Sequence, residues 1–333
     1  MFNLDRWRLS PNVAPVLVAA EIGINHSGDF DLARRLIDSA RESGADAVKF
    51  QVFRTDLFYN RQLASGAYDL FRNFELSFEQ YAKLKEHADS QDILFFATPL
   101  DMESLAFLSG LNVPILKIAS SDITSEPFLA EIARLSREKG QHVVLSTGFV
   151  GLKEVRRAVA ILRGTPLTLL YCVSRYPASA ADGDFDLRFI DTLAREFRVP
   201  VGFSDHSLDI FMSLGAVARG ARMIERHFTL SRSLPGADHA ISLEPAKFAE
   251  LVRGVRELET ALGDGTKRVT AFETGIAPNA MRAVYARRAL KKGDRIAEKD
   301  LILLRPGRGV SLGEWRRLVG AKAGRDIGEY EKI

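Results

Sequence analysis

The sequence predicts a parallel (β/α)8 barrel, a TIM barrel, followed by a small separate domain. Up to residue 263, eight short runs rich in Val, Ile, Leu and Phe alternate with longer amphipathic segments. Polar side chains gather at the ends of these runs, and after residue 263 the alternation stops. Eight strand-then-helix units in about 260 residues match the usual size of such a barrel. An open, doubly wound sheet is the structural alternative.

Each predicted strand is a short apolar run that precedes a segment of helical period. In chain order the strands cover residues 16–24, 47–52, 94–98, 115–119, 143–147, 167–173, 201–204 and 223–228. The clearest helix is 31–43, in which Leu32, Leu36 and Ile37 share one face and Gly44 favours the C-terminal end. Further helices are expected at residues 127–139, 152–163, 187–197 and 245–262.

The composition excludes several classes of protein. The chain has 333 residues, of which 46% are hydrophobic and 27% charged, and it has a single cysteine, Cys172. Disulfide-rich folds and cysteine-ligated zinc modules are therefore excluded. The apolar runs at residues 16–20 and 167–173 fall far short of the ~20 residues of a membrane span. Residues 1–15 lack the apolar block of a secretory signal, so we expect a cytoplasmic protein with a reduced thiol.

The ends of the predicted strands are unusually polar. In (β/α)8 barrels the catalytic groups lie at the C-terminal ends of the strands. Charges that converge on one mouth are costly unless they are paired or used, so a barrel built only for stability would not need them. The sequence therefore predicts an enzyme with an active site drawn from the strand-end residues Glu21, Lys49, Gln51, Thr98, Lys117, Ser120, Ser146, Thr147, Ser174, Ser204, Asp205, His206, Glu225 and His227.

Two histidines stand at the ends of the last two predicted strands. Because residues i and i+2 of a strand share a face, Ser204 lies beside His206 and Glu225 beside His227. Adjacent strands can bring both imidazoles to one metal ion, with carboxylates and water completing its shell. In the absence of thiolates, manganese or magnesium suits this corner better than a structural zinc. The alternative is that both histidines are structural residues.

Two lysines, Lys49 and Lys117, lie on non-adjacent predicted strands, and strand parity points both at the mouth. Together they indicate a phosphate or carboxylate ligand, to which Ser120, Ser146 and Thr147 can add hydrogen bonds. A Schiff-base role for Lys117 is the competing interpretation, and it predicts an aldolase. Either lysine alone could also extend past the barrel rim into solvent.

The chain changes character after the predicted catalytic barrel, residues 1–263. Residues 264–280 form a polar linker with glycine and proline, and the small domain, residues 281–333, contains strand-like runs at 283–286 and 301–304. The small domain carries 14 Lys or Arg against 7 Asp or Glu, whereas the rest of the chain carries 32 against 36. This basic tail suits nucleic acid or a small anionic ligand. Nucleic acid is disfavoured because interleaved aromatic residues are missing, while a non-catalytic carbohydrate-binding protein with a partner-binding tail stays open.

The polar strand ends belong to six longer motifs that together resemble the sialic acid synthase family. The motifs are residues 21–29 (EIGINHSGD), 49–51 (KFQ), 117–122 (KIASSD), 145–148 (LSTG), 202–207 (GFSDHS) and 225–229 (ERHFT). The tail, with residues 291–294 (KKGD) and 304–309 (LRPGRG), is similar to the C-terminal antifreeze-like SAF domain of that family, a β-clip fold. The resemblance covers nearly the whole chain in order, which makes it more specific than any single motif.

The resemblance implies an enzyme that condenses phosphoenolpyruvate with an N-acylated hexose, giving a nine-carbon 3-deoxy-2-ulosonic acid and phosphate. It implies a divalent metal, usually Mn²⁺, on His206 and His227. The residues that would bind phosphoenolpyruvate are Lys49, Lys117, Ser120, Ser146 and Ser204, with Thr98 close by. Those that would line the sugar site are Glu21, Gln51, Tyr176 and Asp238. The catalytic set expected from this is Glu21, Lys49, Lys117 and Asp122.

Three features depart from the family pattern. Asp122 stands where glutamate is common, which shortens a candidate acid-base group by one methylene. Arg175, beside Tyr176, is bulkier and more charged than expected and could alter which sugar fits. The segment 324–329 (GRDIGE) is followed closely by Ile333, which puts the last strand of the small domain in question. The acceptor stays open between N-acetylmannosamine, a diacetamido-trideoxyhexose and a 6-phosphate sugar, and we favour an unphosphorylated one.

Arg305 follows the apolar run 301–304 and precedes Pro306 and Gly307, an order that suits a tight turn with the arginine at its tip. By default an exposed turn arginine only adds solubility. The family pattern implies instead that an arginine at this position enters the partner's barrel and contacts the sugar. A linker extended at ~3.3 Å per residue could reach a neighbouring subunit, so we expect a domain-swapped homodimer.

Overall fold

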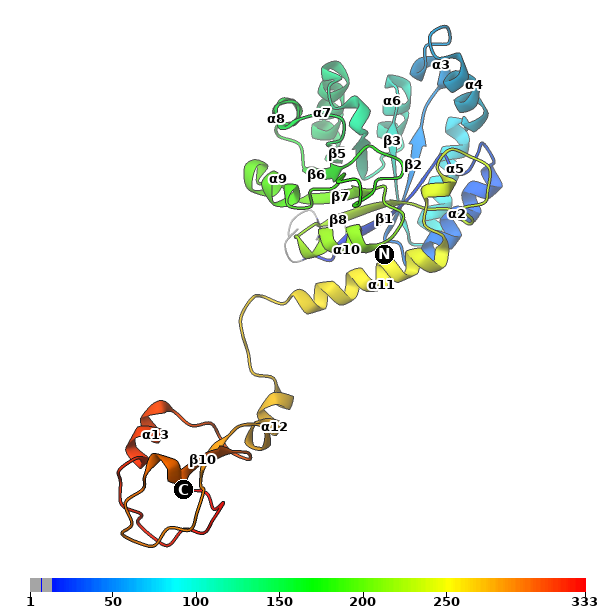
Figure 1. The fold of residues 1–333 in the computed structure, drawn as a ribbon. Coiled ribbons are helices and arrows are strands. Elements are labelled where there is room, and N and C mark those ends of the chain that lie inside the picture. Colours follow the sequence, from blue (N-terminus) through cyan, green and yellow to red (C-terminus); the bar gives the residue numbers. More distant parts are fainter. Residues whose placement is uncertain (1–6, 8–13) are drawn as a thin grey trace. The chain divides into compact units, whose positions relative to one another are not determined.

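The computed structural model describes Trp7 and residues 14–333 (Figure 1). It divides the chain into two compact units, Met1–Gly263 and Asp264–Ile333. The N-terminal segment, in which the sequence predicts no secretory signal, lies almost entirely outside the described residues. In the part of the chain that the structure describes, no helix is long and apolar enough to cross a membrane.

The first unit contains a closed barrel of eight parallel strands in sequential order, which confirms the predicted (β/α)8 fold. The strands are β1 (Leu17–Gly23), β2 (Ala47–Val52), β3 (Leu94–Pro99), β4 (Ile115–Ile118), β5 (His142–Ser146), β6 (Leu167–Cys172), β7 (Val201–Asp205) and β8 (Met223–His227). Their ends differ from the predicted ones by at most one residue. Pairing of β8 with β1 closes the barrel and sets Glu21 opposite His227.

Helices cover the outside of the barrel (Figure 1). The five that the sequence predicts are present as α2 (Phe30–Glu42), α7 (Glu126–Lys139), α8 (Leu152–Ile161), α9 (Phe189–Phe197) and α11 (Pro245–Leu262). The others within residues 14–263 are α5 (Phe78–Ser90), α6 (Met102–Gly110), α10 (Phe211–Ala218) and, between β2 and β3, the short α3 (Thr55–Phe58) and α4 (Ser65–Phe74). Helix α2 shows why they form: the Asp29 side chain accepts a hydrogen bond from the Leu32 amide at the N-terminus, and Leu36 and Ile37 are buried against the sheet.

Inside the barrel, strand alternation stacks an apolar layer below a polar one. The lower layer packs around Trp7 and consists of Leu17, Ala19, Ala47, Phe96, Ile115, Val144, Leu170 and Met223. Two residues further along most of the same strands, the inward positions are Glu21, Lys49, Thr98, Lys117, Ser146, Cys172 and Glu225. Because every second strand residue faces inward, the apolar layer closes the lower end of the barrel and the polar layer lies at the C-terminal mouth.

The second unit has a small core of its own. Strand β9 (Ala283–Ala286) pairs antiparallel with β10 (Leu301–Leu304), at the predicted positions, and α13 (Leu312–Leu318) follows. The buried side chains are Val284, Ala286, Leu290, Ile296, Leu301, Ala323 and Ile327. The end of the chain pairs only through single bridges, Leu290 with Ile327 and Tyr285 with Lys332.

The range predicted as a linker, 264–280, includes a helix that the sequence analysis did not expect, α12 (Ala271–Ala280). Thr270 and Glu273 form a reciprocal capping box at its start. Gly275 and Pro278 lie inside the helix, and their low helix propensity concealed it in the sequence.

Candidate active site

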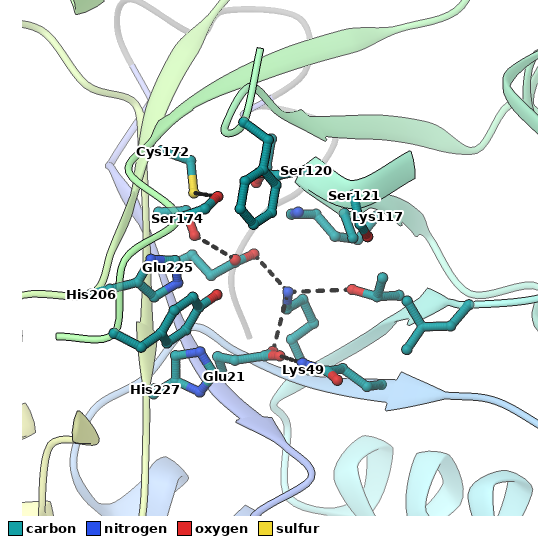
Figure 2. Close-up of a pocket in the computed structure, with 18 of the residues that line it drawn as sticks. Glu21, Lys49, Lys117, Ser120, Ser121, Cys172, Ser174, His206, Glu225 and His227 are labelled. Carbon is teal, nitrogen blue, oxygen red and sulfur yellow. Dashed lines mark hydrogen bonds and ion pairs between the residues drawn. The ribbon is translucent and has the colours of Figure 1, made fainter. Parts of the chain in front are cut away.

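All eight strands contribute to one cavity at their C-terminal ends (Figure 2), with a volume of about 180 Å³. Thirteen residues predicted from the sequence line it: Glu21, Lys49, Gln51, Thr98, Lys117, Ser120, Ser146, Ser174, Tyr176, Ser204, His206, Glu225 and His227. They come from positions up to two hundred residues apart. The barrel therefore assembles the predicted polar groups into a single site.

Lys49 is the centre of a buried charge network (Figure 2). Its Nζ lies 3.3 Å from Glu21 Oε2 and 3.1 Å from Glu225 Oε2, and it donates a hydrogen bond to Thr98 Oγ1 at 3.3 Å. Ser204 Oγ donates to the other Glu225 oxygen at 2.9 Å. Side-chain exposure of the three charged groups is between 2% and 6%, so water does not screen their interaction.

The two carboxylates of this network are not equivalent. Burial raises the pKa of Glu21 above its ordinary value, and the negative charge of Glu225 raises it further against the opposing effect of Lys49. Burial would also raise the pKa of Glu225, but the charges of Lys117 and Lys49 outweigh it and lower that pKa. Glu225 is therefore the ionised member of the pair, and Glu21 is the one that holds a proton more readily.

Lys117 lies on the other side of the mouth and has no carboxylate contact among the described residues. Its Nζ donates to the backbone oxygen of Ile118 at 2.8 Å, and burial, with repulsion from Lys49, lowers its pKa to about 8. Ser146 Oγ is buried nearby in the same cavity without a hydrogen-bond partner in the described part of the chain. Unsatisfied buried donors beside a free cation are suited to an anionic ligand.

Gly148 allows a close approach of Ser120 and Ser174 on the Lys117 side of the cavity. A Cβ atom there would lie 2.1 Å from Ser174 Oγ and 2.8 Å from Ser120 Oγ. The Gly148 amide also donates to Ser120 Oγ at 3.0 Å, which orients that hydroxyl. The glycine of the LSTG motif is therefore required for close approach of three strand ends.

His206 and His227 form the corner that the sequence predicts, with ring centroids 5.5 Å apart. His206 Nδ1 donates to the backbone oxygen of Val173 at 2.8 Å, so in the neutral ring the lone pair is on Nε2. Burial lowers the pKa of His206, but contacts with Cys172 and Val173 outweigh it and raise that pKa. His227 Nδ1 is buried without a hydrogen-bond partner and lies 3.7 Å from Asp238 Oδ2. Burial and the neighbouring His206 lower the pKa of His227 well below its usual range, so its ring is neutral.

This corner fits two nitrogen ligands of a divalent metal. One imidazole has its second nitrogen hydrogen-bonded to a backbone carbonyl, as metal-binding histidines do, and the other presents an unpartnered nitrogen. No group of three His, Cys, Asp or Glu side chains with metal-binding geometry occurs in the described residues. Water and substrate would therefore have to supply the remaining ligands.

Five predicted residues lie outside the cavity lining. Two of them make structural contacts: Thr147 Oγ1 donates to the Leu170 backbone oxygen at 3.0 Å, and Asp205 pairs with Arg226 at 2.8 Å. Asp122 is half-buried beside the mouth, where burial raises its pKa, and Ser121 Oγ donates to it at 3.4 Å. Asp238 approaches the site only through His227, and Arg305 belongs to the second unit. Arg175 pairs with Asp182 and Asp184 at 2.7 and 3.1 Å and is not in the lining, so in this chain its bulk does not narrow the pocket.

Some contacts and lining residues of the site could not be predicted from the sequence. Glu225 was paired with His227 by parity, but its contact with Lys49 could not be read from the sequence. Cys172, interpreted only as a reduced thiol, lines the cavity beside Ser174. The lining also contains four apolar residues from loops and from the segment between β2 and β3, for which the sequence carried no signal: Phe58, Phe71, Leu100 and Phe149.

Comparison with known proteins decides the family. Residues 36–267 match the NeuB family, and residues 282–329 match the SAF domain. The chain belongs to the NeuB family. An N,N'-diacetyllegionaminic acid synthase of Legionella pneumophila is 41% identical to this NeuB-family chain over 324 residues, 92% of the chain and 89% of that protein. The human N-acetylneuraminate-9-phosphate synthase is 35% identical over 326 residues, 92% and 88% of the two chains.

A solved structure supports the same assignment. The N-acetylneuraminic acid synthetase of Leptospira borgpetersenii, in complex with citrate, superposes with a TM-score of 0.71 at 38% identity, over 78% of this chain and 90% of that one. Relatives of this similarity are synthases of nonulosonic acids, so this member of the NeuB family is an enzyme of the sialic acid synthase type. The predicted family, and the barrel followed by a SAF domain, are confirmed.

The Lys49 network leads to a prediction about stability. Lys49→Met should lower the free energy of unfolding by about 3–5 kcal/mol, because it leaves Glu21 and Glu225 buried without a countercharge. Urea denaturation followed by circular dichroism measures the change. Adding Glu225→Gln should recover part of the lost free energy of unfolding. Lys83→Met is the control: it removes an exposed pair with Glu79 and should change that free energy little. Equal stability of Lys49→Met and the parent would contradict this account of the network.

Proposed function

We propose that the protein condenses phosphoenolpyruvate with an N-acylated hexose, giving a nonulosonic acid and phosphate. The observation that carries the proposal is the division of one cavity into a cationic side, with Lys117, and a two-histidine corner, with His206 and His227. An anionic donor and a carbonyl acceptor would occupy these two sides. The names of the relatives support the product class.

On the cationic side, Lys117 would bind phosphoenolpyruvate, with hydrogen bonds from Ser120 and Ser146. Lys49, already bonded to two carboxylates, would mainly position those carboxylates and Thr98 around the reacting carbons. Ser204, which donates to Glu225, belongs to the same supporting network. This proposal differs from the expectation that Lys49 and Ser204 bind phosphoenolpyruvate directly.

On the other side, His206 and His227 would hold a divalent metal, Mn²⁺ or Mg²⁺, with Asp238 and Tyr176 beside them. Such a metal would supply Lewis-acid polarisation of the sugar aldehyde. Gln51 Nε2, which donates to Glu21 Oε1 at 3.3 Å, orients the Glu21 carboxyl at the edge of this corner (Figure 2). From there Glu21 would exchange a proton with the sugar oxygen.

The chemical step would form a bond between C3 of phosphoenolpyruvate and the aldehyde carbon, whose oxygen takes up a proton. Water would then add to the cationic C2, and phosphate would leave with cleavage of its bond to C2. Each turnover consumes one water and gives the 2-keto acid and inorganic phosphate. Preorganised charges on both sides of the cavity would stabilise these charge changes.

Phosphate release tests the proposal. Incubation with phosphoenolpyruvate, Mn²⁺ and either N-acetylmannosamine or a diacetamido-trideoxyhexose should release phosphate and consume the sugar. Absence of turnover with every such hexose, at any divalent metal, would reject it. Burial of Lys117 and its lowered pKa, about 8, also suit a Schiff-base aldolase, which trapping with borohydride and pyruvate would reveal.

The pKa of Lys117 leads to a second prediction. The group is charged below about pH 8 and neutral above it, so kcat/KM for phosphoenolpyruvate should fall about tenfold per pH unit above pH 8. Initial rates between pH 7 and 10 at saturating sugar measure it. Lys117→Gln should have a low kcat/KM without this decline, and a decline of the same size in that variant would assign it to another group.

We also propose that the active form is a homodimer in which Arg305 of one copy enters the barrel of the other. Arg305 is exposed, and the turn behind it is tightly held: the Gly307 amide donates to the oxygen of Pro278, and Tyr285 donates to that of Pro306. A Cβ on Gly307 would lie 2.3 Å from the carbonyl carbon of Arg282. A rigid turn presents the guanidinium at little entropic cost, which supports a binding role.

A further inference from the structure

One side of the cavity is apolar, unlike the rest of the site. Phe58, Phe71 and Leu100 line it, and we call them the apolar wall. Phe58 ends α3, Phe71 lies in α4, and Leu100 directly follows β3, so the wall stands beyond Gln51 and Thr98 on the β2–β3 side of the mouth. A surface of this kind is costly to hydrate, and a ligand with apolar groups on that side would bury it.

The apolar wall is packed against the core. Its residues pack against the buried cluster of Ile24, Phe53 and Phe74. The ring of Phe71 lies 5.3 Å from that of Phe53 and 5.7 Å from that of Phe58, both at steep angles. Each wall residue is therefore half-buried, with one side held by the core and the other facing the cavity. Such a preformed surface selects ligands by shape and polarity without first being ordered.

Cations are absent from this side of the cavity. Among the described residues of the lining, Lys49 and Lys117 are the only Lys or Arg, and Lys49 is neutralised by two carboxylates. Three arginines lie near the wall in sequence, and none is in the lining. Arg54 and Arg72 both pair with Glu75, and Arg61 lies over the ring of Tyr68 at 5.4 Å. The lining supplied by one chain would thus offer a sugar phosphate no countercharge at the wall, whereas a methyl group would find three apolar contacts.

Resting on the condensation proposed above, we propose that the acceptor is a 6-deoxy hexose carrying acylamino groups and no phosphate, and that the apolar wall selects it. N-Acetylmannosamine has hydroxyls at C4 and C6 where a 2,4-diacetamido-2,4,6-trideoxyhexose has an acetamido and a methyl group. An apolar pocket discriminates against an added hydroxyl by about 100-fold in kcat/KM. Phe71 and Leu100 are thus specificity-determining residues.

The test compares kcat/KM for three acceptors at saturating phosphoenolpyruvate: 2,4-diacetamido-2,4,6-trideoxymannose, N-acetylmannosamine and its 6-phosphate. The parent enzyme should prefer the first by about 100-fold or more and use the phosphate least. Phe71→Asn should reduce the preference at least about tenfold, while Phe71→Leu retains most of it and KM for phosphoenolpyruvate stays unchanged. Phe211→Asn is the matched control, because that ring is 65% exposed and outside the cavity lining.

Calorimetric binding of the corresponding borohydride-reduced sugars, which cannot react, separates this inference from the proposed function. Tighter binding of the reduced diacetamido sugar than of the other two would support the wall's role even if no turnover were found. Equal kcat/KM for the three sugars, or preference for the phosphate, would overturn the inference while leaving the condensation standing. If Phe71→Asn lowered kcat/KM equally for all three sugars, Phe71 would have a structural role only and the inference would be overturned. If no sugar bound or reacted, both proposals would fall.

Discussion

His206→Ala and His227→Ala should each lower metal-dependent turnover by at least about 100-fold and leave the barrel folded, since the loss of a direct ligand costs more than the 10- to 100-fold typical of outer-shell partners. Both imidazoles face the cavity, and neither belongs to the apolar layers that stabilise the barrel. Mn²⁺ binding, followed by electron paramagnetic resonance, should weaken in parallel with activity. Circular dichroism and thermal unfolding measure the fold.

His239 provides the control for this pair. It is a third buried histidine near the same corner, but its Nδ1 contacts Thr229 Oγ1 at 2.7 Å and it does not line the cavity. His239→Ala should keep Mn²⁺ binding at the parent level. If the two cavity histidines could be replaced with Mn²⁺ affinity unchanged and only folding lost, they would be structural residues and the metal would lie elsewhere.

Mixing two inactive variants should restore activity if Arg305 acts in the other subunit. In a heterodimer of Arg305→Ala and His206→Ala chains, one site combines an intact barrel with an intact arginine, and both lesions fall in the other site. Random reassembly makes half of the dimers hybrid with one good site each, so about a quarter of the parent activity should return. The measurement is phosphate release after joint unfolding and refolding of the two chains.

Two controls complete the complementation experiment. Differently tagged chains, recovered by tandem affinity purification, show that hybrids form. His206→Ala mixed with His227→Ala should remain inactive, because both lesions lie in the barrel and no hybrid contains an intact site. If heterodimers of the Arg305→Ala and His206→Ala chains form but are as inactive as each variant alone, Arg305 does not act in the other subunit.

The sequence predicted the barrel strands to within one residue because its apolar runs are short, buried and regularly spaced. The same parity argument placed Lys49, Lys117, His206 and His227 at one mouth, where the structure finds them. Prediction from the sequence missed helices whose local pattern is not typical of a helix. Helix α12 was hidden by Gly275 and Pro278, and α3 and α4 are too short and irregular to be recognised from periodicity.

What the sequence by itself determined was the order of the elements and the face on which each strand residue lies, since both follow from periodicities of two and 3.6 along the chain. Only the tertiary structure decided which of these groups touch. Glu225 pairs with Lys49 because β2 and β8 lie on either side of β1. Arg175 pairs with Asp182 and Asp184 and does not line the pocket. Phe58 and Phe71 reached the cavity because the segment between β2 and β3 folds over the mouth, which depends on packing between residues distant in sequence and not on any local pattern.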